Sequence, residues 1–232
     1  MKSRGDTVPE ILKFLGSVPL FSKIRDSSAR VLAEASSFQH LAKGEVLFLQ
    51  SDPCEAAYIV RSGNISIVLQ SPDGREMIIN EMRSGDVFGE LGILTHKSRS
   101  TSAVAKSNSE ILVIPHKAFL GVMDEEPQLA RLILEITANR LQMSSEREGA
   151  LVFMDAQARL AHLLLELEKQ EKETGYITVS QDELAHHTGL IRQTVAKALG
   201  NWRRRGYLLT GRGRIVLLNH KALRELADRM II

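Results

Sequence analysis

The chain has 232 residues, of which 44% are hydrophobic and 25% are charged. This composition can supply cores for two modest domains and excludes a chain that is disordered throughout. A single cysteine, Cys54, excludes an internal disulfide and a cysteine-based metal cluster. No apolar run reaches the roughly 20 residues of a membrane-spanning helix, and the start of the sequence lacks a signal-peptide pattern. We therefore expect a cytoplasmic protein without a membrane partner.

Charge is distributed unevenly along the chain. Residues 1–155 contain 17 Lys and Arg against 20 Asp and Glu, a balance of −3, whereas residues 156–232 contain 13 against 8, a balance of +5. A basic C-terminal segment is typical of a protein with a polyanionic partner. A solvated basic surface gives the same pattern, so charge alone leaves both interpretations open.

The N-terminal half changes from a helical to a β pattern. Short helices are predicted over residues 9–15 and 26–36. Between residues 38 and 115, β-branched segments alternate with glycine-containing turns, which predicts a compact barrel, roll or sandwich. The predicted strands cover residues 45–49, 57–60, 64–68, 76–79 and 109–114.

A long helical pattern begins at Pro127. Its apolar positions recur at a spacing near 3.5, which predicts a helix over residues 127–154 that pairs with the same helix of a second copy. The alternative is a helix packed on its own roll. A second amphipathic helix is predicted over residues 155–173. The apolar positions of the first helix are Leu129, Ile133, Ile136, Met143, Ala150 and Met154.

The C-terminal segment predicts a helix-turn-helix. Ser180 and Glu183 fit a capping box at the start of one helix, and Gly189 can take the positive φ of a tight turn. A second helix is expected over residues 192–203. An ordinary helix pair is the alternative, because this pattern alone is only moderately specific.

The exposed face of the second helix carries the candidate DNA-reading residues. Arg192 suits guanine and Gln193 suits adenine, at the helix end that meets base edges. Thr194 and Lys197 add a hydroxyl group and a further cation.

A β-hairpin is predicted downstream, over residues 207–218. Arg212 and Arg214 lie near its tip. They are expected on the phosphate backbone, which positions a protein on DNA without specifying the sequence.

Residues 85–103 contain a second candidate site. Gly89 and Gly92 let backbone amides approach a ligand, and a short helix starting there would present free N–H groups to a phosphate. Arg99 offers a cationic fork for phosphate oxygens, Ser100 offers a hydroxyl donor, and Glu90 can accept from a ribose hydroxyl. From these residues alone, a glycine-rich hairpin with a structural Glu90–Arg99 ion pair is the alternative.

The order of these motifs resembles a known family. Gly89-Glu90-Leu91, followed nine residues after the glutamate by Arg99-Ser100, resembles the phosphate-binding cassette of cyclic-nucleotide-binding domains. The C-terminal part is similar to the winged helix of the CRP/FNR superfamily. The resemblance runs from about residue 10 to residue 220 in the same order.

This resemblance implies an α+β protein with three segments. A cyclic-nucleotide-binding, jelly-roll-like β-roll with N-terminal helices would cover residues 1–126. A dimerisation helix would cover residues 127–154, and a winged helix-turn-helix would cover residues 155–232.

The resemblance also implies an effector, which would be cyclic AMP. Ser144 would contact the base from the same subunit, whereas Ser145, about 100° further around the helix, would reach the base held by the partner. The implied ligand-binding residues are Ile67, Ile79, Gly89, Glu90, Leu91, Arg99, Ser100, Ser144 and Ser145.

Some residues depart from the family's cyclic-AMP receptors. Ser144 replaces a threonine, Gln193 and Lys197 replace a glutamate and an arginine, and the spacing from Glu90 to Arg99 is one residue shorter. Residues 170–176 form a shorter connection than the loop that contacts RNA polymerase. Whether this connection makes that contact is therefore left open.

We expect a homodimeric regulator in which the effector sets the spacing of two recognition helices on a palindromic, double-stranded operator. RNA polymerase is an expected partner if the regulator is an activator. One alternative keeps this role with cyclic di-GMP or with no effector, and another is a regulatory module that acts on a protein partner. The sequence shows no nucleophile–base pair and no metal-ligand spacing, so neither catalysis nor a metal is expected.

Overall fold

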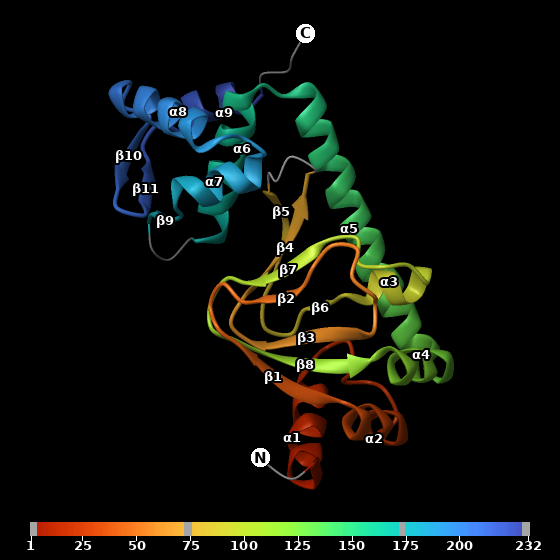
Figure 1. Cartoon of the computed structure of the whole chain (residues 1–232). Coiled ribbons are helices and arrows are strands. Elements are labelled where there is room, and N and C mark those ends of the chain that lie inside the picture. The colour runs from red at the N-terminus through yellow and green to blue at the C-terminus, as the bar shows by residue number, and fades with distance from the viewer. Residues whose placement is uncertain (1–3, 72–75, 172–174, 229–232) are drawn as a thin grey trace. The chain divides into compact units, whose positions relative to one another are not determined.

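The computed structural model describes residues 4–71, 76–171 and 175–228. The chain forms two compact units, residues 1–139 and 140–232. Helix α5 (Pro127–Phe153) runs through this division as one continuous helix (Figure 1). Within the described ranges, no helix combines the length and the apolar character needed to cross a bilayer.

The first unit contains two four-stranded antiparallel sheets, with the strand orders β1-β8-β3-β6 and β2-β7-β4-β5. The prediction of a jelly-roll-like β-roll is confirmed. The strands are β1 (Ser37–Leu41), β2 (Val46–Phe48), β3 (Ala56–Ser62), β4 (Ile65–Gln70), β5 (Glu76–Met82), β6 (Val87–Phe88), β7 (Ser102–Ala105) and β8 (Ser109–Pro115). The predicted strands all appear, whereas β1, β6 and β7 were not expected.

Strand β3 is buried on both faces because successive side chains point to opposite sides of a sheet. Tyr58 and Val60 contribute to a core shared with the second sheet. Ala57 and Ile59 contribute to another core, shared with the helices. The β1-β8-β3-β6 sheet is therefore the middle layer of this unit.

Helices cover the outer face of that middle sheet. They are α1 (Arg4–Ser17), α2 (Asp26–Ala35), α4 (His116–Glu125) and the beginning of α5. Leu129 and Ile133 of α5 are buried in this core, and Ile136 packs against it. The prediction that Leu129 and Ile133 face a second copy is therefore wrong, whereas the dimer contact predicted for half-buried Ile136 and exposed Met143 stays a prediction. A heptad-like spacing marks an apolar face, but it does not say whether that face packs within the chain or on a second copy.

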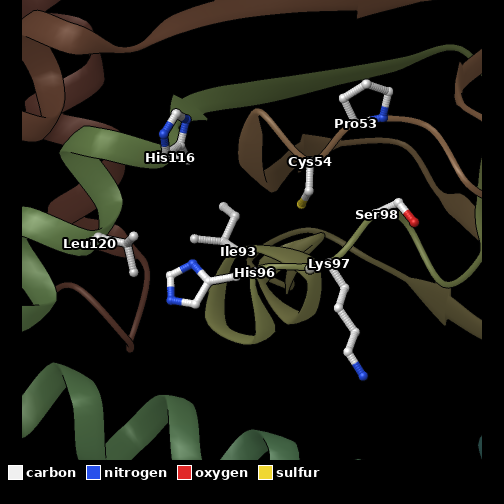
Figure 2. Close-up of a pocket in the computed structure, with 9 residues that line it drawn as sticks. Pro53, Cys54, Ile93, His96, Lys97, Ser98, His116 and Leu120 are labelled. Atoms are coloured by element: carbon white, nitrogen blue, oxygen red, sulfur yellow. The ribbon is translucent and has the colours of Figure 1, made fainter.

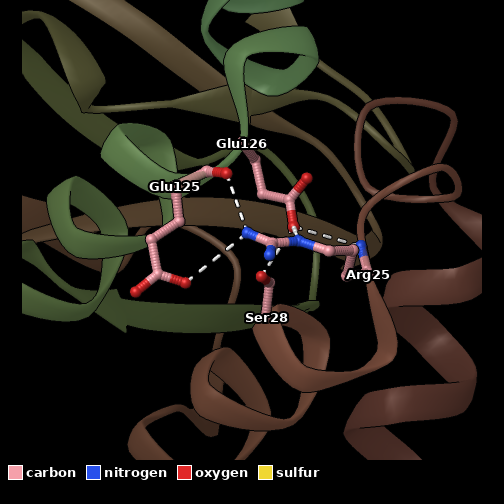
Figure 3. Close-up of polar contacts among 4 residues, drawn as sticks. All are labelled: Arg25, Ser28, Glu125 and Glu126. Atoms are coloured by element: carbon pink, nitrogen blue, oxygen red, sulfur yellow. Dashed lines mark hydrogen bonds and ion pairs between the residues drawn. The ribbon is translucent and has the colours of Figure 1, made fainter.

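A polar junction fixes the beginning of α5 (Figure 3). Glu126, which lies between α4 and α5, is only 8% exposed. Its Oε1 accepts hydrogen bonds from Ser28 Oγ at 2.7 Å, from Arg25 Nε at 2.8 Å and from the Arg25 backbone N–H at 3.2 Å. The hydrogen bonds from Ser28 and Arg25 lower the pKa of Glu126. The junction ties the start of α2 to the start of the long helix.

The second unit is a helical domain with a small sheet of strand order β10-β11-β9. Trp202, Leu160, Leu184 and Leu199 lie in its core. The predicted capping box of Ser180 and Glu183 is confirmed, as is the left-handed Gly189 at the turn. The elements are α6 (Ala156–Gln170), β9 (Ile177–Thr178), α7 (Gln181–Thr188), α8 (Arg192–Arg204), β10 (Leu208–Gly211), β11 (Arg214–Leu217) and α9 (His220–Ala227).

Two details of this unit differ from the prediction. Helix α6 ends at Gln170, before the predicted end at Glu173, and residues 172–174 lie outside the described residues. Strand β9 and helix α9 were not predicted. Helix α9 packs on α6, where His220 Nε2 lies 2.8 Å from a carboxylate oxygen of Glu168.

Candidate effector pocket and nucleic-acid interface

Backbone hydrogen bonds to Ser51 and Asp52 position Arg99. Its N–H donates to the carbonyl oxygen of Asp52 at 2.9 Å, and its own carbonyl oxygen accepts from the N–H of Ser51 at 2.8 Å. Ser51 adopts a left-handed φ of 74° in this turn. Held in this way, the Arg99 side chain enters the roll and is 5% exposed.

The Arg99 guanidinium is surrounded by acceptors and rings. Nη1 donates to the carbonyl oxygen of Gly89 at 2.7 Å, and Nη2 donates to the Ala56 carbonyl at 2.7 Å and the Tyr58 hydroxyl at 3.2 Å. Its central carbon lies 4.2 Å from the ring centroid of Phe48 and 5.1 Å from that of Tyr58. Both rings stabilise a cation at such distances.

Gly89 precedes helix α3 (Glu90–Thr95) and has a φ of 76°. A Cβ at this position would lie 2.7 Å from Arg99 Nη1 and 2.9 Å from the Tyr58 ring. Both the left-handed backbone and the close approach of Arg99 therefore require glycine here.

The Arg99 side chain has a hydrogen-bond donor available for an anion. Its Nε is buried and has no hydrogen-bond partner among the residues that the structure describes. A buried N–H group without a partner is costly, and a phosphate oxygen is a strong acceptor for it. The residues present fit the cyclic phosphate that the resemblance implies.

The other predicted ligand-binding residues occupy different surroundings. Glu90 is buried at the start of α3, and Ile67 and Ile79 pack into the core that also contains Phe48 and Tyr58. Leu91 and Ser100 are exposed.

Ser144 and Ser145 belong to the second unit, where Ser144 is half-buried and Ser145 is exposed. Their contact with a nucleotide stays a prediction. So do the roles of the cassette residues.

Sequence reasoning did not select Phe48 and Tyr58. The Phe48 and Tyr58 rings are stacked with centroids 5.6 Å apart, and burial raises the pKa of the Tyr58 hydroxyl. These residues come from β2 and β3, far from the cassette in sequence. No local motif marks them. The sequence shows only that they belong to strands whose side chains alternate between the two faces of a sheet.

A separate cavity of about 330 Å³ lies beside α3; of the residues predicted to approach a ligand, Gly92 lines it, whereas Glu90 and Arg99 do not. Figure 2 shows the thiol of Cys54 and the ring of His96 at this cavity, with Ile93 between them. Burial raises the pKa of Cys54, and its Sγ lies 3.5 Å from the carbonyl oxygen of Gly89. Nowhere in the described ranges do three His, Cys, Asp or Glu side chains gather as a metal site requires.

Helix α8, the predicted recognition helix, has one buried face and one exposed face. Val195, Leu199 and Trp202 of α8 are buried in the domain core. Gln193 and Lys197, one turn apart on the opposite face, are exposed. The amide and the ammonium group are therefore free to meet a partner.

The ends of the predicted interface are less uniform. Arg192 is exposed but lies 3.4 Å from a carboxylate oxygen of Asp182, and Thr194 is half-buried. In the wing, Arg212 is exposed in the turn between β10 and β11. Arg214 is also exposed and stacks over the Tyr176 ring at 4.6 Å.

Two family models match the segments of the chain that contain the candidate sites. Residues 38–126 match the family "Cyclic nucleotide-binding domain", and residues 158–226 match the "Crp-like helix-turn-helix domain". The cAMP-activated global transcriptional regulator CRP of Salmonella typhimurium is 30% identical over 66% of this chain and 76% of that protein. The CRP-like cAMP-activated global transcriptional regulator of Mycobacterium tuberculosis is 28% identical over 84% of this chain and 90% of that protein.

A solved structure gives the same answer for the fold. The c-di-GMP responsive global regulator CLP of Xanthomonas campestris superposes with a TM-score of 0.76 at 22% identity, over 83% of this chain and 99% of that one. Two family matches in this order, together with the Salmonella relative, identify the chain as a member of the CRP/FNR family of DNA-binding transcription regulators.

Proposed function

We propose that cyclic AMP is the effector of this regulator and that Arg99 binds its phosphate. The observation that carries this proposal is the buried Arg99 guanidinium, whose Nε has no partner among the described residues. The Mycobacterium and Salmonella relatives are both named as cAMP-activated. Glu90, buried at the start of α3, would accept from the ribose hydroxyl.

The charge of the site supports a ligand with one phosphate. Arg99 is the one buried arginine or lysine in the part of the chain that the structure describes. Cyclic AMP carries a single phosphate charge, whereas cyclic di-GMP carries two. A site with one buried cation therefore favours cyclic AMP over cyclic di-GMP.

The proposal also includes a homodimer that binds a palindromic double-stranded operator in the cytoplasm. Leu134 and Leu141 of α5 are each 68% exposed and lie seven residues apart, on one helix face. Ser145, four residues after Leu141, lies on the same face. A second copy of α5 would cover both leucines. Ser145 would then face the nucleotide that this second copy holds. Where the regulator activates transcription, RNA polymerase is a partner.

Calorimetric titration of the full-length protein tests the effector. We expect saturable binding of cyclic AMP with one ligand per protomer, and weaker binding of cyclic GMP and cyclic di-GMP. A tighter complex with cyclic di-GMP, or no heat with any of the three, would contradict the proposal.

Selection from a random oligonucleotide pool, with and without cyclic AMP, tests the DNA-binding part. We expect enrichment of a palindrome with half-sites about 34 Å apart, and stronger enrichment when cyclic AMP is present. An enriched site that does not depend on any nucleotide would favour the effector-free alternative.

A further inference from the structure

Helix α8 begins with an exposed isoleucine. Ile191 is its N-cap residue and is 59% exposed. The segment before the helix is extended at this residue, with φ of −81° and ψ of 145°. Leu190 packs against the domain core, and successive side chains of an extended segment point to opposite sides, so Ile191 points outward.

This isoleucine does not help the helix to form. The other described helices that begin in this unit have a capping side chain, which is Asp155 for α6, Ser180 for α7 and Asn219 for α9. Ile191 makes no capping hydrogen bond. Isoleucine is among the least favourable N-cap residues, and an exposed apolar side chain gains nothing in water.

Polar side chains follow Ile191 in the first turn of the helix. Arg192 lies 3.4 Å from a carboxylate oxygen of Asp182, and Gln193 is exposed at the next position. The first turn of α8 therefore presents an apolar group, a cation and an amide in succession. The matching edge must offer an apolar group beside hydrogen-bonding atoms.

We propose that Ile191 contacts the C5-methyl group of a thymine in the DNA major groove. That methyl group is the apolar feature among the base edges of this groove, and the first residues of a recognition helix contact those edges. The inference rests on the proposed entry of α8 into the major groove. It adds one thymine per half-site that Ile191 selects by its methyl group.

Replacing thymine by deoxyuridine tests this contact, because deoxyuridine lacks only the C5-methyl group. Each thymine of the selected operator is replaced in turn, symmetrically in both half-sites, and the affinity of the full-length protein is measured at one salt concentration. We expect a loss at a single symmetric position, about fourfold for each half-site, which corresponds to one buried methyl group.

Two variants make the assignment specific to Ile191. Ile191→Ser introduces a capping side chain and removes the apolar one. This variant should bind the thymine and deoxyuridine operators equally well. Leu218→Ser, which removes another exposed apolar side chain outside α8, should keep the full difference.

Each outcome decides the inference. It is overturned if deoxyuridine is tolerated at every position, if the operator lacks thymine in its half-sites, or if the Ile191→Ser protein keeps the difference. Failure of the wild-type protein to select any DNA sequence would instead overturn the proposed function, and the thymine contact with it.

Discussion

Arg99 makes hydrogen bonds through Nη1 and Nη2 within the protein, which leaves Nε for a ligand. Lysine at this position would keep the positive charge but not the planar fork. We expect Arg99→Lys to weaken cyclic AMP binding by roughly tenfold to a hundredfold, measured by calorimetry, because a charge-assisted hydrogen bond is lost. Arg30→Lys, an exposed control on α2, should bind as the wild type does. Unchanged cyclic AMP affinity in Arg99→Lys would show that Arg99 does not bind the phosphate.

Glu126 gives the fold a defined response to acid. Its pKa is lowered in the folded state, so its contribution to stability is present above its unfolded pKa and is lost as the pH falls through the folded value. Glu126→Gln should therefore unfold at a lower urea concentration than the wild type at pH 7. The difference should shrink as the pH falls below the unfolded glutamate pKa of about 4.3, and it should vanish below the folded pKa of Glu126, which is lower. Glu125→Gln is the matched control on the exposed neighbour, and an equal, pH-independent loss in both variants would contradict the assignment.

At the scale of elements, local signals decided what the sequence could predict. The start of α7 and the turn after it were predicted in detail, because Ser180, Glu183 and Gly189 act within a few residues of one another. Strands β6 and β9 each have two residues, too few for an alternating pattern. Strand β1 pairs with β8, about 70 residues later, and this long-range pairing fixes it as a strand.

The candidate effector site divides in the same way. Gly89, Glu90 and Arg99 belong to one short motif and were predicted from it. Phe48 and Tyr58 were not, because their contact with Arg99 joins segments that are distant in sequence. For α5, a spacing of 3.5 predicted the helix, but the burial of Ile133 shows that part of this apolar stripe serves its own unit.

The exposed Leu134 and Leu141 of α5 replace the buried Leu129 and Ile133 as the predicted dimer contact. A charge on this face would be desolvated in a two-helix interface, so Leu134→Glu combined with Leu141→Glu should give monomers by light scattering. Specific DNA affinity should fall with dimerisation, because each monomer has one recognition helix. Val31→Glu, which places the same charge at an exposed apolar site on α2, should remain dimeric. A dimeric double variant would show that another surface holds the two copies together.

Arg99 and Glu90 lie in the first compact unit, whereas the helix-turn-helix lies in the second, and helix α5 is continuous through both. Effector control then requires that cyclic AMP binds the DNA-competent state more tightly than the other state. Linkage makes this coupling reciprocal. Operator DNA should raise the affinity for cyclic AMP by the same factor by which cyclic AMP raises the affinity for the operator. Calorimetry of each ligand, with and without the other, measures both factors, and a factor of one in both titrations would contradict control of DNA binding by cyclic AMP.

The charge distribution of the whole chain makes a final prediction about salt. The net charge is only +2, but residues 156–232 carry 13 Lys and Arg against 8 Asp and Glu. Counterion release lowers the logarithm of DNA affinity linearly with the logarithm of salt concentration, by about 0.9 for each phosphate contact. Arg212, exposed at the wing turn, is predicted to contact one phosphate in each protomer. Arg212→Gln should therefore flatten the slope by about 1.8 for the dimer, with the base preferences unchanged. Gln193→Ala should do the opposite, changing the preference at one position per half-site while the slope stays the same. A slope that is equal in Arg212→Gln and the wild type would place the wing away from the phosphate backbone.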